Sequence, residues 1–338
     1  MNYIGSKLKL SNFITETIHN TVGENLSGKT FCDLFAGTGI VGRNFKDKVK
    51  QVIANDIEYY SYVLNRNYIE NRFAIEKIDC LMSGLNKIEP KEGFIYKNYC
   101  FGSGSNRRYF SDENGKKIDA IRQQIQSLKN NNSINDDTYF FLLCSLLESA
   151  DKVANTASVY GAFLKNLKPT ARLNLELKPA NFIESKNQHI AYNRDSNELI
   201  KQISGDILYL DPPYNTRQYG ANYHLLNTIA LYDKFIPKGK TGLRDYNRSK
   251  YCSKNSILNE FDELIKNANF KYIFLSYNNE GLLSLNQIKE IMSKYGKYGV
   301  VYKEYQRFKA DKDKNRNHKA DKTVEFLHIL EKRNNFLY

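Results

Sequence analysis

Residues 206–215 read Asp206-Ile-Leu-Tyr-Leu-Asp-Pro-Pro-Tyr-Asn215, and this stretch decides how the chain folds. The apolar run predicts a buried strand at 207–210. The two prolines end that strand, because neither has an N–H and both fix φ. The chain is therefore stiff where Asp211 and Tyr214 leave the strand. A carboxylate, the carbonyl of Pro212 and an aromatic face lie within four residues, and such a set can hold a flat heterocycle that carries an amino group.

These groups fit the methylation of the exocyclic amine of a nucleobase. Such an amine is a poor nucleophile, because its lone pair is delocalised into the ring. Asp211 can accept one amine hydrogen and the Pro212 carbonyl the other, which favours a pyramidal nitrogen. Pro213 stiffens the turn, and Tyr214 can stack on the base with ~1–3 kcal/mol. The pattern leaves open whether Asp211 takes the proton or only orients the amine.

A glycine-rich turn follows an earlier predicted strand at 30–35. Its residues, Ala36-Gly-Thr-Gly39, let the backbone approach a ligand closely and open a helix whose N–H groups point outward. The next predicted strand, 51–54, ends at Asn55-Asp56, where an acid can bind a ribose diol. The turn lacks the G-K-[ST] of a P-loop and the full dinucleotide fingerprint. A tight turn with a capping aspartate is the alternative interpretation.

Three motifs in this order resemble the S-adenosylmethionine-dependent amino-methyltransferases of DNA: Asn2-Tyr-Ile-Gly-Ser-Lys7, Asp33-Leu-Phe-Ala-Gly-Thr-Gly39 and Asp211-Pro-Pro-Tyr214. Their order is that of the alpha arrangement, which includes the Dam-like adenine enzymes and many type II modification methyltransferases. The resemblance covers residues 1–70 and 188–335. It implies S-adenosylmethionine as cofactor and adenine N6 in duplex DNA as target, since cytosine N4 enzymes more often begin the last motif with Ser. It also implies a cognate restriction endonuclease in the same system, without stable contact.

The resemblance implies roles for the matching positions. Tyr3 and Lys7 would close over the cofactor, Asp56 would bind its ribose hydroxyls and Ile57 would pack on its adenine. The methionine portion would be held by Asp33, Phe35, Ala36, Gly37 and Gly39. Asp195 would bond the adenine amine of the cofactor. For that last role Asp206 is a competitor, and a helix N-cap is the alternative function of Asp195.

Basic segments are candidates for contact with duplex DNA, in which the target base must flip out of the stack. Residues 234–254 carry seven basic side chains and one acid, and residues 303–322 carry eight basic and four acidic ones. Such loops can neutralise phosphates, although many charge runs are only solvated. Candidate contacts are Asn215, Arg217, Lys240, Arg244, Arg248, Arg307 and Lys309. In the loop 101–109, Arg107 and Arg108 are candidates for reading a guanine in the major groove.

Composition is consistent with a folded nucleic-acid binder. The chain has 338 residues, 41% of them hydrophobic, and a formal net charge of +13,. Its five cysteines include no C-x-x-C pair, so we expect no metal and a reducing, cytoplasmic setting. We find no apolar run of signal-peptide or membrane-spanning length.

The predicted fold class is α/β, a Rossmann-like and mostly parallel sheet with helices on both faces, because strands and helices alternate. Further strands are predicted at 188–192, 270–276, 300–305 and 324–330, the last two as a closing hairpin. We expect the catalytic domain to comprise 1–75 and 188–338. Residues 76–187 are predicted to be a mostly helical insertion, with helices at 116–129 and 138–154 and a loop at 96–115, and it is a candidate target-recognition domain.

The favoured hypothesis is a sequence-specific DNA adenine N6-methyltransferase, the modification half of a type II restriction system. One alternative is an RNA base-amine methyltransferase, and another is a non-catalytic nucleic-acid binding protein. The intact glycine turn and the Asp211–Tyr214 motif disfavour the second alternative. The stretch 214–226 resembles enzymes that modify CATG, which is the recognition sequence we expect.

Overall fold

The computed structural model describes residues 7–306 and 322–333. The chain forms two compact units. We call one the sheet unit, which holds the described parts of 6–57, 185–218 and 248–338. We call the other the helical unit, which holds residues 58–184 and 219–247.

The sheet unit is built on one seven-stranded sheet in the order β3-β2-β1-β4-β5-β7-β6. Strands β3, β2, β1, β4 and β5 run parallel to one another, whereas β7 is antiparallel to both β5 and β6. The strands are β1 (Thr30–Asp33), β2 (Gln51–Asn55), β3 (Ile190–Tyr192), β4 (Ser204–Leu210), β5 (Asn269–Asn278), β6 (Gly296–Gln306) and β7 (Lys322–Lys332). This arrangement confirms the predicted α/β fold class.

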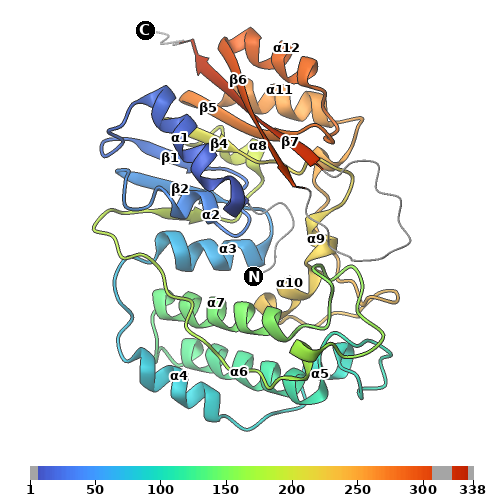
Figure 1. Ribbon diagram of the computed structural model, residues 1–338. Coiled ribbons are helices and arrows are strands. Elements are labelled where there is room, and N and C mark those ends of the chain that lie inside the picture. Colours follow the sequence, from blue (N-terminus) through green and yellow to red (C-terminus); the bar gives the residue numbers. More distant parts are fainter. Residues whose placement is uncertain (1–6, 307–321, 334–338) are drawn as a thin grey trace. The chain divides into compact units, whose positions relative to one another are not determined.

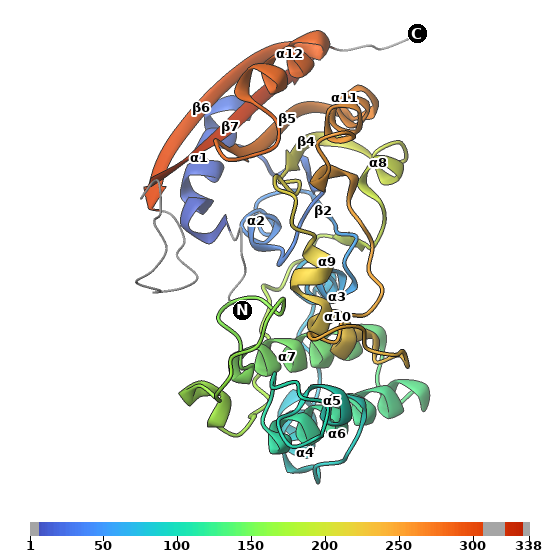
Figure 2. The ribbon, with the colours of Figure 1, turned by 90° about the vertical axis from the view of Figure 1, so that its right-hand side faces the viewer.

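Helices cover both faces of this sheet, with α1 and α2 on one face and α8 and α11 on the other (Figures 1 and 2). The central strands are therefore buried on both sides and read as continuous apolar runs. Phe31 stacks on Phe45 toward one face, with 4.2 Å between ring centroids, whereas Cys32 joins a cluster with Phe261 and Leu264 of α11 on the other. The helical elements of this unit are η1 (Lys7–Leu10), α1 (Ser11–Val22), α2 (Ile40–Arg43), α8 (Ser196–Leu199), η4 (Lys250–Cys252), α11 (Ile257–Asn267) and α12 (Leu285–Tyr295).

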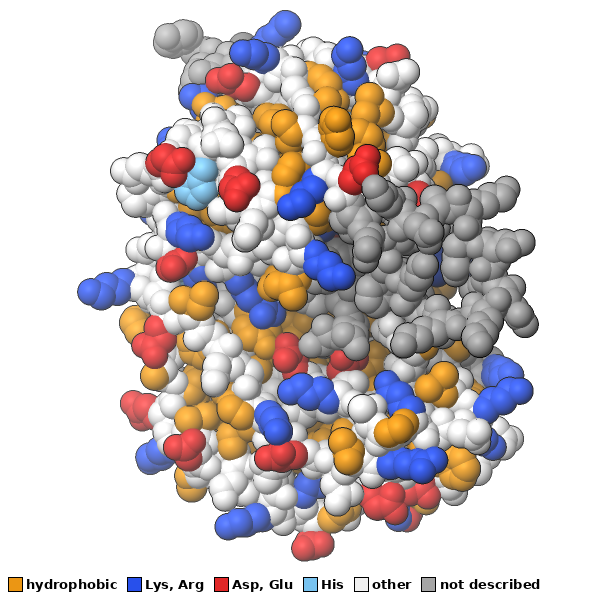
Figure 3. Space-filling view, viewed as in Figure 1, with side chains coloured by type: hydrophobic (Ala, Val, Ile, Leu, Met, Phe, Trp, Pro, Cys, Tyr) orange, Lys and Arg blue, Asp and Glu red, His pale blue; other side chains and the backbone are white. Residues whose placement is uncertain are grey.

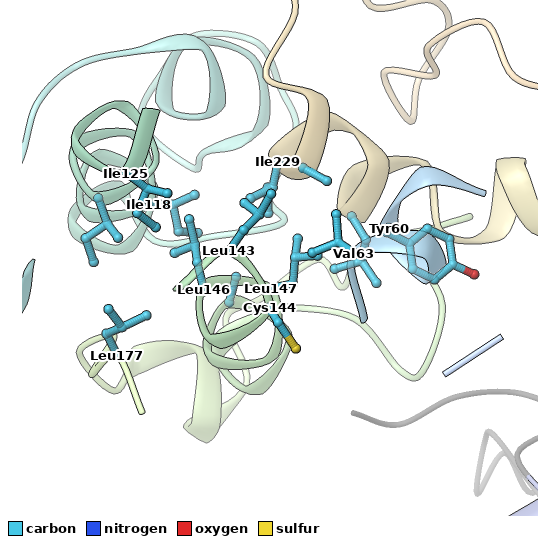
Figure 4. Close-up of a cluster of buried hydrophobic side chains, with 14 of the residues drawn as sticks. Tyr60, Val63, Ile118, Ile125, Leu143, Cys144, Leu146, Leu147, Leu177 and Ile229 are labelled. Atoms are coloured by element: carbon cyan, nitrogen blue, oxygen red, sulfur yellow. The ribbon is translucent and has the colours of Figure 1, made fainter. Parts of the chain in front are cut away.

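The helical unit packs around α6 and α7. Figure 4 shows apolar side chains of α6, α7, α3 and α10 meeting in one cluster, among them Ile118, Leu143, Val63 and Ile229. The helix α7 is apolar nearly all round because it lies at the centre of this cluster. The elements are α3 (Tyr59–Asn65), the π-helical turn η2 (Arg66–Glu70), α4 (Ile78–Lys87), α5 (Phe94–Tyr99), α6 (Asp112–Asn130), α7 (Asp136–Val153), η3 (Pro169–Arg172), α9 (Tyr219–Asn222) and α10 (His224–Leu231).

Residues 164–182 are mostly irregular and run along the helical unit, and we call them the strap. Hydrogen bonds from side chains to its backbone hold the strap in place, because it forms no strand pairing. Asn114 is the clearest case. Its Nδ2 donates to the carbonyls of Ala171 and Leu173, and its Oδ1 accepts from the N–H of Leu175. Short polar side chains bind the rest of the strap in the same way: Asn67, Asn86, Ser145, Ser149 and Asn155.

The structure differs from the predicted elements in two places. The predicted loop at 96–115 is wrong at both ends, because α5 extends to Tyr99 and α6 begins at Asp112. The N-terminus of α5 is stabilised by Asp119 of α6, which accepts from the N–H groups of Gly93, Ile95 and Tyr96, so its cap lies far away in the sequence. Residues 58–75 and 219–247 belong to the same compact unit as the predicted insertion, since their apolar side chains share its core.

Residues 23–30, Gly-Glu-Asn-Leu-Ser-Gly-Lys-Thr, match the P-loop pattern, although they lie outside the glycine turn. A P-loop needs a strand before it and a helix after it. Here the order is reversed, with α1 before the segment and β1 after it. Lys29 also forms an ion pair with Asp206, with 3.1 Å between Nζ and Oδ1. The segment is therefore a connection and not a phosphate loop.

Candidate active site at the carboxyl edge of the sheet

The parallel strands β1, β2, β3 and β4 end at one edge of the sheet, where α/β folds place their ligands. Asn55, at the end of β2, joins three of these strand ends. Its Nδ2 donates to the carbonyls of Leu34 and Arg194, and its own carbonyl accepts from the N–H of Ala36. Sequence reasoning missed Asn55, because its neighbour Asp56 carried the resemblance.

The glycine turn leaves β1 in a conformation that needs glycine. Gly37 and Gly39 have φ of 52° and 73°, in the left-handed region that side chains rarely adopt,. The N–H of Gly37 donates to Oδ2 of Asp56 at 2.8 Å, so the carboxylate at the end of β2 braces the turn. The structure thus brings Ala36, Gly37, Gly39 and Asp56 together at this turn, and their contact with a cofactor stays a prediction.

Asp33 is buried behind this turn. Its Oδ2 accepts from the N–H of Gly42 at 3.1 Å, whereas its Oδ1 has no hydrogen-bond partner among the described residues. Burial raises the pKa of this carboxyl to about 8, although the Gly42 N–H lowers it, and the charges of Asp211 and Asp56 add to the increase. A buried acceptor of this kind is a place for a cationic group.

Asp211 follows β4 directly and pairs with Lys7 of η1, with 3.0 Å between Nζ and Oδ1. Burial raises the pKa of Asp211 to about 6, the ammonium of Lys7 lowers it and the charge of Glu325 raises it. Burial alone would lower the pKa of Lys7, but Asp211 and Glu325 place it well above its usual value. The structure places the ammonium of Lys7 beside the motif carboxylate, and its predicted closure over the cofactor stays a prediction.

A second carboxylate, on β7, also contacts the ammonium of Lys7. Glu325 of β7 has its Oε1 3.0 Å from Nζ of Lys7, and the hydroxyl of Ser276 on β5 donates to the same oxygen at 2.5 Å. Sequence reasoning missed both Glu325 and Ser276. The available signal was an acid at an inward position in the apolar strand 324–330.

Tyr214 is held with its ring beside this charged group. The ring lies 5.6 Å from Nζ of Lys7 and makes an edge contact with Tyr277, with 6.1 Å between centroids. The carbonyl of Tyr214 accepts from the N–H of Leu282. The motif Asp211–Tyr214, including the buried Pro212 and the half-buried Pro213, is thus fixed by contacts on both sides.

The structure also shows what surrounds three further predicted cofactor residues, Asp195, Phe35 and Ile57, and the competitor of Asp195, Asp206. Asp195 caps α8, its Oδ1 accepting from Asn197 and Glu198, and it is exposed at the end of β3. Asp206 lies at the start of β4, where it binds Lys29 and the N–H of Thr30, so it is at the wrong edge to compete for a cofactor. The half-buried Phe35 packs edge-on against Tyr251, and the carbonyl of Ile57 accepts from Asn193.

The predicted DNA-binding arginines are partly engaged within the helical unit. Arg107 donates to the carbonyls of Asn98, Pro237 and Gly239, and Arg244 forms a two-bond pair with Asp233. Arg108 donates to the carbonyl of Lys165 and lies over the ring of Phe101. These contacts hold loops in place.

The other predicted DNA contacts remain accessible or lie outside the described residues. Lys240, Arg217 and Arg248 are exposed, and Asn215 accepts from the N–H of Arg217. On the face drawn in Figure 3, basic and acidic side chains are interspersed rather than gathered in one patch of described residues. Tyr3, Arg307 and Lys309 lie outside the described residues.

The described part of the chain contains neither a membrane-spanning helix nor a cluster of metal ligands. None of its helices combines the length and apolar character needed to cross a membrane. No group of three or more His, Cys, Asp or Glu side chains in the same ranges is arranged to hold a metal ion.

Comparison with known proteins gives consistent matches. The model of the family described as D12 class N6 adenine-specific DNA methyltransferase matches residues 3–291. Type II methyltransferase M.NlaIII of Neisseria lactamica is 67% identical over 332 residues, 98% of this chain and 99% of that protein. M.CviAII of Paramecium bursaria Chlorella virus 1 is 39% identical, covering 92% of this chain and 93% of that protein. M.FokI of Planomicrobium okeanokoites is 41% identical over 92% of this chain, which spans 50% of that protein. None of these relatives supports an RNA methyltransferase or a non-catalytic binding protein.

Proposed function

This chain belongs to the D12 class N6 adenine-specific DNA methyltransferases, and we propose that Asp211 and the Pro212 carbonyl accept the two hydrogens of the adenine amine. The observation that carries this proposal is the ion pair between the half-buried Asp211 and the buried Lys7 beside the ring of Tyr214. Lys7 engages Oδ1, and we assign Oδ2 to the substrate amine. With a pKa of about 6, Asp211 is ionised at neutral pH and is a stronger acceptor than an ordinary aspartate,.

Tyr214 is assigned to stacking on the flipped adenine. The edge contact with Tyr277 holds its ring, and the N–H of Leu282 holds its backbone carbonyl, so less freedom is lost on binding,. Stacking of a base on an aromatic ring contributes ~1–3 kcal/mol. Pro212 and Pro213 hold the carbonyl and the ring in a fixed relation, because their φ angles are set by the pyrrolidine rings.

The methyl donor used generally in this class is S-adenosylmethionine, which supplies a methyl group on a positively charged sulfonium. The carboxylates of Asp56 and Asp211 make this region favourable for a cation, and the carboxyl of Asp33 can ionise when a cation binds beside it,. We assign the methionine portion to the glycine turn, with its ammonium at Oδ1 of Asp33, which has no partner among the described residues. The remaining assignments are Phe35, Ala36, Gly37 and Gly39 for the methionine portion, Asp56 for the ribose, and Ile57 and Asp195 for the adenine.

We assign recognition of duplex DNA to exposed basic side chains and to the helical unit. Lys240, Arg217 and Arg248 are exposed, so we assign them to phosphates,. Arg107, Arg108 and Arg244 hold loops, and we expect them to act by shaping that surface rather than by reading bases. Relatives that are type II methyltransferases support a role as the modification enzyme of a restriction system. We propose that the cognate endonuclease acts without stable contact with this chain. CATG is the sequence that we propose it modifies.

The proposal is tested by methyl transfer to duplex oligonucleotides with tritiated S-adenosylmethionine, followed by digestion to nucleosides. We expect label in N6-methyldeoxyadenosine with duplexes that contain CATG, and none with RNA of the same sequence. Asp211→Ala should abolish the label. The matched control Asp206→Asn changes an acid on the same strand at the opposite edge of the sheet, and it should retain activity. Label in cytosine, or label that persists in Asp211→Ala, would contradict the assignment.

A further inference from the structure

Glu325 is a buried acid whose position is explained by neither the fold nor the motifs. It lies on β7 opposite Asn278 of β5, and 1% of its surface is exposed. Burying a carboxylate is costly unless it is paired. Its Oε1 meets the Lys7 ammonium at 3.0 Å and accepts from the Ser276 hydroxyl at 2.5 Å.

Lys7 is shared equally between two acids. Its Nζ is 3.0 Å from Oδ1 of Asp211 and 3.0 Å from Oε1 of Glu325. One positive charge therefore faces two negative charges in a space where the Lys7 and Glu325 side chains are 4% and 2% exposed. An ammonium that is shared in this way neutralises neither carboxylate completely.

We propose that Glu325 is a positioning residue for methyl transfer, which holds one side of the Lys7 ammonium and so preserves the strength of Asp211 as an acceptor for the substrate amine. This inference rests on the proposed role of Asp211. Glu325 does not touch the substrate in this arrangement, and it acts through Lys7. If Glu325 loses its charge, Lys7 pairs with Asp211 alone. The ammonium then draws electron density away from the Asp211 oxygens that must accept the amine hydrogen.

Other ionisable side chains face the Lys7 ammonium, but they are neutral near pH 7. Glu325 is therefore the second charged partner of Lys7, beside Asp211. Tyr209 from β4, Tyr214 from the loop after it and Asp33 from β1 have pKa values that burial raises. All three are therefore mostly protonated near neutral pH. The charge of Glu325 raises the pKa of Asp211, and the charge of Lys7 lowers it. Removing the Glu325 charge should accordingly lower the pKa of Asp211.

The test is the single-turnover rate of methyl transfer to duplex DNA as a function of pH, for wild type and Glu325→Gln. We expect the midpoint of the acid limb to fall by about one pH unit in the variant, and the plateau rate to fall about tenfold. The matched control is Glu331→Gln, the same change at an exposed position of the same strand. It should leave both the midpoint and the plateau unchanged.

Glu325→Asp provides the second variant, and it keeps the inference testable if Glu325→Gln does not fold. The shorter side chain withdraws the carboxylate from Lys7 without removing its charge. We expect a midpoint and a plateau between those of wild type and Glu325→Gln. A midpoint that stays at the wild-type value in the folded variants, whether or not the rate falls, would overturn the inference.

Asp211→Asn separates failure of this inference from failure of the proposed function. If Asp211→Asn keeps the wild-type rate and pH profile, the role of Asp211 itself is wrong. If Asp211→Asn is inactive while the Glu325 variants keep the wild-type midpoint, the proposed function stands and only the inference about Glu325 fails.

Discussion

The strap of the helical unit and the carboxyl edge of the sheet both bury polar groups, but they satisfy them differently. Along the strap, neutral side chains of the neighbouring helices, such as Asn114 of α6 and Ser145 of α7, meet backbone groups of the strap one by one. At the sheet edge the buried groups are ionisable. Lys7 is divided between Asp211 and Glu325, and one oxygen of Asp33 has no partner among the described residues.

This difference separates architecture from chemistry. A neutral hydrogen bond that is fully made stabilises one conformation and has little left to offer a ligand. A charge that is shared or incompletely paired is expensive to bury, and it remains able to interact with a substrate or cofactor. We therefore expect changes in the strap to affect folding and changes at the sheet edge to affect the reaction.

The largest expected effect is on catalysis. Asp211→Asn should lower the single-turnover rate by about 10²–10⁴-fold, because an amide is a much weaker acceptor of the amine hydrogen. The rate should be measured under saturating cofactor and DNA, together with the midpoint of thermal unfolding. Loss of the fold along with the rate would remove the contrast between the two regions.

A substitution that releases the strap should lower stability rather than the rate of methyl transfer. Asn114→Ala removes hydrogen bonds to three backbone groups and leaves the N–H of Leu175 buried without its partner. We expect the free energy of unfolding to fall by about 2–4 kcal/mol in urea titrations. Asn130→Ala, at the exposed end of the same helix, is the control and should change it by under about 0.5 kcal/mol,. Cofactor affinity that falls in step with stability would contradict the separation.

Asp33 provides a prediction in which pH is the variable. Because the folded pKa, about 8, is above the unfolded value, the protonated carboxyl stabilises the fold at low pH. This stability is lost as pH rises from about 4 to about 8. Asp33→Asn has no such titration. Relative to wild type, it should gain at least ~2 kcal/mol in unfolding free energy between pH 5 and pH 8.5, while its cofactor affinity falls. Parallel stability curves for the two proteins would show that Asp33 is not buried as a neutral acid.

The smallest effect is a proton count. If the ammonium and sulfonium of the cofactor lie near Asp33, binding should lower the pKa of this carboxyl from about 8 and release up to one proton at pH 7,. Calorimetry in buffers with different ionisation enthalpies measures this number directly. Asp33→Asn should bind with no comparable release, and uptake of a proton by wild type would reverse the sign that we expect.

Much of the fold was predictable because its signals are local. The apolar runs and glycine turn predicted β1, β2, β4, β5 and the closing hairpin, and Asp211–Tyr214 predicted the centre of the site. The sheet order and the shared ammonium were not predictable, since Lys7, Asp211 and Glu325 come from three distant segments that only the folded sheet brings together. The cap of α5 was missed for the same reason, because Asp119 reaches it from another helix.

The most direct test of the central claim, that charge at the carboxyl edge of the sheet serves adenine methylation, is single-molecule sequencing of DNA from cells that express this protein. Cells expressing Asp211→Ala and Asn114→Ala should be sequenced beside them. We expect N6-methyladenine at one short sequence in the wild type, none in Asp211→Ala, and the same sequence modified in Asn114→Ala wherever that variant is folded. An absence of modified adenine in the wild type, or its persistence in Asp211→Ala, would contradict the account.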